Sequence, residues 1–159
     1  MGFRCEVELI AYRLGHVDYP ILDGGGAFKY GSRWCSPGRY IVHAATAYSL
    51  AVLENVVHWG VASLPPGMRF VRVSIPAATS CKMLEPTDLP GWDAYPYGPS
   101  QPYGDAWYDS LESAVLVVPS VLSPFEPNVL INPRHPEFGS ISASDPAPAI
   151  LDPRLVASA

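Results

Sequence analysis

The stretch RYIVHAATAYSLAVLENVVHWG, residues 39–60, contains a change of hydrophobic period that sets the fold class. Residues 39–44 are rich in β-branched and aromatic side chains, which favours a strand. Thr46 is a suitable N-cap for a helix and Gly60 a suitable stop. Between them, apolar residues recur at helical spacing, at Ala47, Leu50, Ala51, Leu53 and Val57. The stretch therefore predicts a strand followed directly by a helix.

The chain on either side of this stretch predicts more strands and two long loops. Strands are expected over residues 5–12, 69–76, 114–122 (interrupted at Pro119) and 128–132. Residues 15–38 and 85–105 follow neither period and are expected to be loops. The 18 prolines and 13 glycines break the chain into short elements, which argues against a helical bundle. We expect one α+β domain over residues 1–159, with short mixed or antiparallel sheets and a few helices.

Composition excludes several classes of protein. The 10 Lys and Arg against 15 Asp and Glu give a formal charge of −5, so the basic surface of a nucleic-acid-binding protein is not expected. The three cysteines are widely spaced and form no CxxC pair, which argues against a disulfide framework and suits a reducing cytoplasm. No apolar run is long enough to cross a membrane. We expect a cytoplasmic protein that contacts neither nucleic acid nor membrane directly.

Arg33 is the first candidate site residue. It lies beside Trp34 in GSRWCSPG, residues 31–38, where small neighbours let a bulky ligand approach the backbone. A guanidinium in such a turn can form paired hydrogen bonds to phosphate or carboxylate. The alternative is a surface arginine that covers Trp34.

Glu54 and Ser120 are further candidates. The Glu54 carboxylate lies beside the apolar stripe of the predicted helix, and a partly desolvated carboxylate needs a partner. Ser120 follows the proline that interrupts an apolar strand, where its hydroxyl could face a cleft or cap a turn. An ordinary exposed helix glutamate is the alternative for Glu54. The four histidines show no metal-ligand spacing, so no metal is expected.

Taken together, these segments resemble the RES-domain family, named for an arginine, a glutamate and a serine. The resemblance runs through YRL (12–14), GSRWCSPGRYIVHAATAYSLAVLENVVH (31–58), LPPGMRFVRVSIP (64–76), YGDAW (103–107), VPSVLSPFEPNVLINPRHPEF (118–138) and LDPRL (151–155). The three eponymous positions fall on Arg33, Glu54 and Ser120. A further family arginine falls on Arg13.

The resemblance implies a fold similar to ADP-ribosyltransferase toxins and a reaction that consumes NAD. Glu54 would stabilise the positive charge that develops on the ribose, or orient the ribose hydroxyls, and Ser120 would bind nicotinamide or ribose. Arg13, His43 and Trp34 are the expected NAD-binding residues, with Arg33 and Arg13 pairing with the pyrophosphate or a carboxylate. NAD is then a substrate, and the reaction needs no metal.

The sequence departs from the family pattern near Arg33. His43 stands where the family commonly has tyrosine, and Ser32 and Cys35 replace a glycine and an asparagine. These changes leave open an altered rate or a different acceptor for ADP-ribose.

Several functions follow from the resemblance. The leading one is a toxin that degrades NAD, by hydrolysis or phosphorolysis, and arrests growth until a cognate antitoxin with a helix-turn-helix DNA-binding part blocks it. An oligomer with that antitoxin is possible. The alternatives are ADP-ribosylation of one specific protein, a degenerate domain that only binds a nucleotide or a partner, and a soluble α+β domain with no NAD site.

Overall fold

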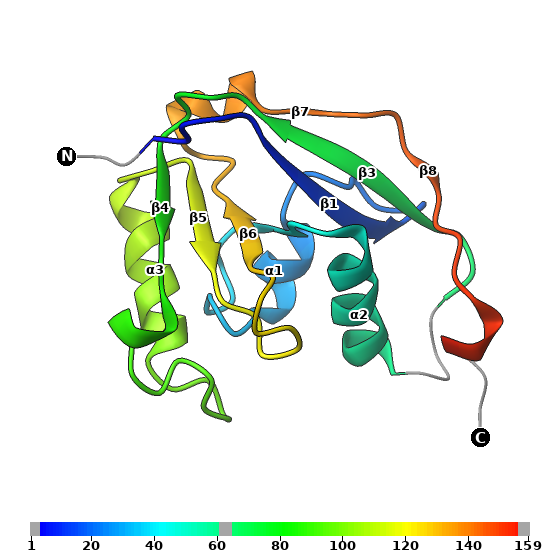
Figure 1. Ribbon diagram of the computed structural model, residues 1–159, viewed down its shortest axis with the longest axis horizontal. Helices are drawn as coiled ribbons and strands as arrows, with labels where there is room; N and C mark the ends of the chain where they lie inside the picture. The colour runs from blue at the N-terminus through cyan, green and yellow to red at the C-terminus, as the bar shows by residue number, and fades with distance from the viewer. Residues whose placement is uncertain (1–3, 61–64, 156–159) are drawn as a thin grey trace.

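One sheet of eight strands, bent across the molecule, positions all the other elements (Figure 1). The computed structural model describes residues 4–60 and 65–155, so the two ends of the predicted 1–159 domain lie outside the described residues. The strands follow the order β4-β5-β6-β2-β1-β3-β7, and β8 also pairs with β3. Their bounds are β1 Leu9–His16, β2 Val42–Ala45, β3 Met68–Ile75, β4 Cys81–Met83, β5 Val115–Val118, β6 Asn128–Ile131, β7 Ser142–Ala143 and β8 Ala147–Pro148.

The sheet is mixed, because β4 and β5 are parallel and the other pairs are antiparallel. The long strands β1 and β3 pair over their full length, from Leu9 opposite Ile75 to His16 opposite Met68. Within the described chain the α-helices are α1 Gly25–Tyr30, α2 Tyr48–Trp59 and α3 Ser100–Ser110, and short 3₁₀ turns lie at Pro86–Asp88, Pro136–Ser140 and Pro153–Leu155. The predicted α+β class is confirmed.

Strand β5 and all but the first residue of β6 are buried on both faces, which explains their apolar sequences. In β5, Val115 and Val117 belong to one buried cluster, whereas Leu116 and Val118 belong to another. The second cluster includes Trp34 and Trp107, from the Arg33 turn and α3. A third cluster joins α2 to the sheet through residues such as Leu50 and Val56. Burial of β5 on both sides fixes the position of the loop that follows it.

The ends of helix α2 and of strand β3 lie within one residue of the predicted ends. Gly60 ends α2 as expected, but the helix begins at Tyr48 and its N-cap is Ala47. Thr46 does not cap it, because its hydroxyl donates to the Pro127 carbonyl instead. Leu53 and Val57, which were expected to lie within the buried stripe, are exposed. The buried face consists of Leu50, Ala51, Val52 and Val56.

Three other predictions from the sequence are wrong in part. Strand β1 begins at Leu9 rather than residue 5 and continues to His16. The expected 15–38 loop contains α1, which starts after Gly24, a residue with φ of 73° whose backbone packs against Ile41. The expected 85–105 loop ends early, because α3 begins at Ser100.

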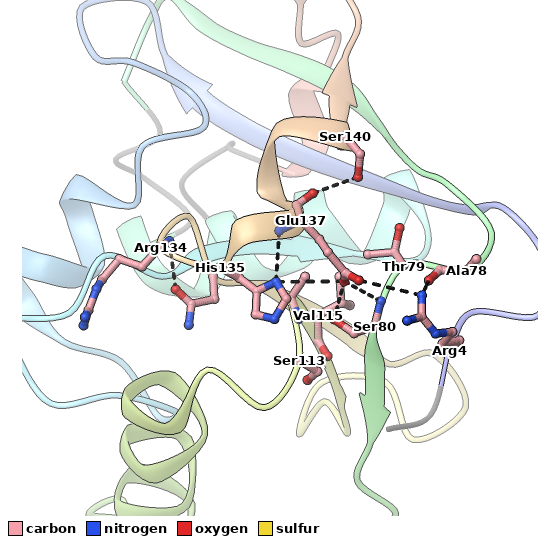
Figure 2. A network of polar contacts seen from close by, with 12 residues as sticks. Arg4, Ala78, Thr79, Ser80, Ser113, Val115, Arg134, His135, Glu137 and Ser140 are labelled. Atoms are coloured by element: carbon pink, nitrogen blue, oxygen red, sulfur yellow. Dashed lines mark hydrogen bonds and ion pairs between the residues drawn. The ribbon is translucent and has the colours of Figure 1, made fainter. Parts of the chain in front are cut away.

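A polar network closes the end of the sheet at which β5 begins (Figure 2). The Glu137 carboxylate accepts hydrogen bonds from the backbone N–H and the hydroxyl of Ser80, and it lies 3.7 Å from the guanidinium of Arg4. The Ser80 hydrogen bonds, with smaller contributions from His135 and Arg4, lower the pKa of Glu137. This network joins the N-terminal segment to the 3₁₀ turn at Pro136–Ser140, whereas Ser120 follows the opposite end of β5.

Candidate active site

Glu54 contacts two side chains that the sheet brings beside helix α2. Its Oε1 accepts a hydrogen bond of 2.9 Å from the Ser120 hydroxyl and one of 2.6 Å from the Asn128 side-chain amide. Asn128 begins β6 and pairs with Ala45, the last residue of β2 before α2. Asn128 also pairs with Val118, the last residue of β5. The register of three strands therefore brings these side chains together.

Both hydrogen bonds to Glu54 end on the same carboxylate oxygen. Within the part of the chain that the structure describes, no group donates a hydrogen bond to Oε2. A carboxylate held through one oxygen has a fixed orientation and keeps lone pairs of the other oxygen for a ligand. The expectation that Glu54 needs a partner is confirmed.

Ser120 is buried and holds two neighbours at once. Its hydroxyl donates to Glu54 and accepts a 3.1 Å hydrogen bond from the backbone N–H of Leu122. A cavity of about 190 Å³ opens beside it, lined by residues 83–86 and 123–127 together with Val117 and Pro119. Ser120 therefore joins the Glu54 carboxylate to the wall of a cavity.

Arg13 and His43 form a second group, on the neighbouring strands β1 and β2. One Arg13 guanidinium nitrogen donates to the His43 carbonyl at 2.8 Å, and Nε donates to the Ile21 carbonyl. Burial lowers the pKa of Arg13, and the nearby Asp23 carboxylate opposes this shift. Because an arginine pKa lies far above neutrality, the group remains charged.

His43 is neutral at physiological pH. Burial, followed by the positive charge of Arg13, lowers the pKa of His43 to about 4. Its Nδ1 lies 3.2 Å from the Ile41 carbonyl, which can only accept, so Nδ1 carries the proton. Nε2 then accepts from the Ser32 hydroxyl at 2.9 Å. This hydrogen bond ties β2 to the turn that carries Arg33.

Arg33 extends from its turn to the long segment that precedes α3. One of its terminal nitrogens donates to the carbonyls of Trp92, at 3.1 Å, and Ala94, at 2.9 Å, and its guanidinium lies 5.1 Å from the centre of the Tyr97 ring. Among the described residues, no carboxylate lies within ion-pair distance of Arg33. The charge of Arg33 is therefore available to an anionic ligand.

Trp34 lies in the core rather than on the surface. Its side chain is only 3% exposed and stacks on Trp92, with ring centres 6.2 Å apart. Trp92 covers one side of the Trp34 ring, and the alternative that Arg33 is a surface arginine covering Trp34 stays untested. The expected contact of Trp34 with NAD stays a prediction.

Helix α3 forms hydrogen bonds with the turn that carries Arg33. The Gln101 amide donates to the carbonyls of Ser32 and Cys35, at 3.0 and 3.1 Å. One turn later, Asp105 accepts hydrogen bonds from the backbone N–H and hydroxyl of Ser36. Between them, Gly104 packs on the Trp34 carbonyl so closely that a Cβ atom would lie 1.7 Å from its oxygen. The conformation of the turn is thus set by α3 as well as by its own residues.

The candidate residues therefore form three groups. Glu54 and Ser120 touch, Arg13 and His43 touch, and Arg33 and Trp34 belong to the turn that His43 reaches through Ser32. The sequence analysis missed Asn128 and Gln101. The available signal for Asn128 was its place as the polar first residue of the predicted 128–132 strand. Among the described residues, no His, Cys, Asp and Glu side chains gather into a group that could hold a metal ion.

Comparisons with known proteins agree on one family. The model of the RES domain matches residues 10–152. A protein of Sphingobium sp. (strain YBL2) called Prs ADP-ribosylating toxin is 41% identical over 142 residues, covering 87% of this chain and 88% of that protein. A Toxin Res of Yersinia enterocolitica is 36% identical over 135 residues, covering 83% of this chain and 88% of its own length.

A solved structure shares the fold at low sequence identity. The crystal structure of the M. tuberculosis MbcT-MbcA toxin-antitoxin complex contains a chain that matches with a TM-score of 0.66 and 16% identity, covering 91% of this chain and 85% of that one. The matched range includes all six candidate residues. The chain belongs to the RES domain family.

Proposed function

We propose that this protein is the toxin of a bacterial toxin-antitoxin pair, and that it consumes NAD⁺ by breaking the bond between nicotinamide and ribose. Family membership supports this function, as do the relatives named Toxin Res in Yersinia enterocolitica and Pseudomonas putida. The observation that carries the proposal is the Glu54 carboxylate, which Ser120 and Asn128 hold through one oxygen.

The chemistry needs a fixed negative charge beside the ribose. When the bond from C1′ to the pyridinium nitrogen breaks, its electron pair leaves with nicotinamide, which departs as a neutral molecule. Positive charge then develops on the ribose, as in glycosidic cleavage, and a carboxylate placed in advance stabilises it. Glu54 Oε2 supplies that charge. An oxygen of water or of ionised phosphate then bonds to C1′; if the acceptor is water, one of its protons passes to the solvent.

The positive charges suit the other half of the substrate. Arg33 has no carboxylate partner among the described residues, so it can pair with the pyrophosphate. Arg13 donates two hydrogen bonds to backbone carbonyls. Its main contributions are therefore its charge and the hydrogen bond that holds the His43 backbone in place. Neutral His43 offers its ring to the substrate without adding a third positive charge to those of Arg33 and Arg13.

A second candidate function is transfer of ADP-ribose to a protein. It is favoured by the 41% identical relative named Prs ADP-ribosylating toxin. In this reaction a side chain of the target protein replaces water or phosphate as the acceptor at C1′. The cleavage step and the role of Glu54 are the same in both candidates.

The proposed partner is an antitoxin with a helix-turn-helix DNA-binding part, in the cytoplasm, with which the toxin can form an oligomer. A negatively charged toxin leaves contact with DNA to that partner. None of the helices in the described ranges is both long and apolar enough to cross a membrane.

Growth and cellular NAD after induction test the proposal. We expect induction without antitoxin to arrest growth and deplete NAD, and Glu54→Gln to abolish both effects. Glu112→Gln is the matched control, because Glu112 is exposed in the loop after α3 and, among the described residues, its side chain pairs only with Lys82 of β4. Mass spectrometry separates the two candidates, since free ADP-ribose or its phosphate marks NAD degradation and a modified protein marks transfer. Full toxicity of Glu54→Gln would contradict both.

A further inference from the structure

We infer that Asn128 is a positioning residue for Glu54, whose amide holds one carboxylate oxygen so that the other faces the ribose of NAD. The inference rests on the proposed function, because it concerns the same carboxylate. Asn128 lies outside the arginine, glutamate and serine that name the family.

The backbone of Asn128 is fixed on both sides. It is the first residue of β6 and pairs with Ala45 on β2 and Val118 on β5. Its side chain reaches Glu54 on α2, 74 residues away in sequence, with 2.6 Å between Nδ2 and Oε1. A side chain anchored in the middle of a sheet can hold a helix carboxylate more rigidly than one from a free loop.

The chemistry of the two groups sets the orientation of the amide. An ionised carboxylate can only accept, so the NH₂ group of Asn128 faces Glu54 and its Oδ1 points elsewhere. That oxygen is buried and accepts no hydrogen bond from the described residues. A buried carbonyl without a partner destabilises the folded protein, and an apolar side chain of similar size would avoid this cost. The role of Asn128 is therefore to hold the Glu54 carboxylate and not to stabilise the core.

Ser120 and Asn128 together determine which oxygen of Glu54 is free. The Ser120 hydroxyl is already engaged with Glu54 and with Leu122, and both donors converge on Oε1. Hydrogen bonds to a charged group are stronger than those between neutral groups. Loss of the Asn128 donor would let the carboxylate rotate about its remaining contact.

Steady-state kinetics of NAD cleavage by the full chain tests this role. We expect Asn128→Leu to lower kcat by about 10- to 100-fold with KM changed by less than about twofold, because the carboxylate acts mainly in the transition state. The melting temperature should not fall. In a Glu54→Gln background, Asn128→Leu should change the residual kcat by less than about twofold. An equal loss in both backgrounds, or no loss in the native one, would overturn the inference.

Two further variants separate positioning from structural support. Asn128→Asp places a second carboxylate against Glu54, so its kcat should rise as the pH is lowered and one proton is shared between the pair. Asn128→Leu should not show this recovery. Asn132→Leu is the matched structural control, because Asn132 is buried at the other end of β6 and donates to the Tyr108 carbonyl. It should lower the melting temperature and leave kcat of the folded protein unchanged.

A measurement without NAD separates this inference from the proposed function. The ¹H–¹⁵N signals of the Asn128 side-chain amide should shift in Glu54→Ala and stay in place in Glu112→Gln. Signals unmoved by Glu54→Ala would overturn the inference. If they shift but the native protein does not cleave NAD, the proposed function fails, and with it the catalytic part of the inference.

Discussion

Glu54 obtains its defined orientation from residues far away in sequence. Ser120 and Asn128 lie 66 and 74 residues from it, and both donate to Oε1. The carboxylate could be proposed as a site residue from its place beside an apolar helix face. Which of its two oxygens receives both hydrogen bonds could not be predicted, because this depends on the register of β5, β6 and β2.

His43 gives a prediction for pH dependence at the scale of one residue. Its pKa of about 4 in the folded protein lies below the ordinary 6.5, so between these values the unfolded chain binds a proton that the folded protein does not. The contribution of His43 does not reduce the free energy of unfolding above pH 6.5. As the pH falls toward 4, the free energy of unfolding decreases by up to about 3 kcal/mol because of this group. Urea unfolding at several pH values measures it.

His43→Gln is the variant that tests this assignment. A glutamine oxygen can accept from Ser32 in place of Nε2, and glutamine does not titrate. We expect the variant to lose less stability than the native protein between pH 6.5 and 4. The same loss in both proteins would show that His43 is not the responsible group.

At the scale of elements, α3 and the Arg33 turn depend on each other. Gln101, Gly104 and Asp105, on one face of α3, all contact residues 32–36. This explains why α3 was missed from the sequence. Pro102 and Gly104 both disfavour a helix interior, but proline is tolerated in the first turn and glycine is required where the Trp34 carbonyl approaches.

Two glycine-to-alanine substitutions are expected to change the stability in opposite directions, one at the α3 contact and one away from it. Gly104→Ala places a Cβ 1.7 Å from the Trp34 oxygen and should force α3 away from the turn, at a cost of roughly 2–4 kcal/mol. Gly26→Ala, in α1, meets nothing within 4 Å and should stabilise the protein by up to about 1 kcal/mol. Thermal unfolding of both variants measures these effects. A Gly104→Ala protein as stable as the native one would contradict the close contact.

Other elements were predictable because the alternation of apolar and polar residues in their sequence matches the burial of those residues in the fold. Strand β3 alternates between buried Val71, Val73 and Ile75 and more exposed neighbours, as its sequence indicates. By contrast, β4, β7 and β8 have only two or three residues and exist because a neighbouring strand pairs with them. A single sequence holds no period over so short a range.

At the scale of the whole molecule, the Glu137 network and the hydrogen bonds to Glu54 lie at opposite ends of β5. The Glu137 network joins the N-terminal segment to the end of the sheet at which β5 begins (Figure 2). At the end where β5 stops, its last residue Val118 pairs with Asn128, and Asn128 also pairs with Ala45, which shortly precedes α2. The family resemblance indicates Glu54 and Ser120 near this second end but not Asn128, and the grouping of the three required the strand order.

The rate of NAD⁺ loss with purified protein, with and without inorganic phosphate, tests the central proposal most directly. We expect turnover by the native protein and by Glu112→Gln, and a loss of at least about 100-fold in Glu54→Gln, because the charge beside the ribose is removed. Acceleration by phosphate would identify phosphate rather than water as the acceptor. Cleavage by Glu54→Gln at the native rate, or none by the folded native protein, would contradict the proposed NAD⁺ degradation.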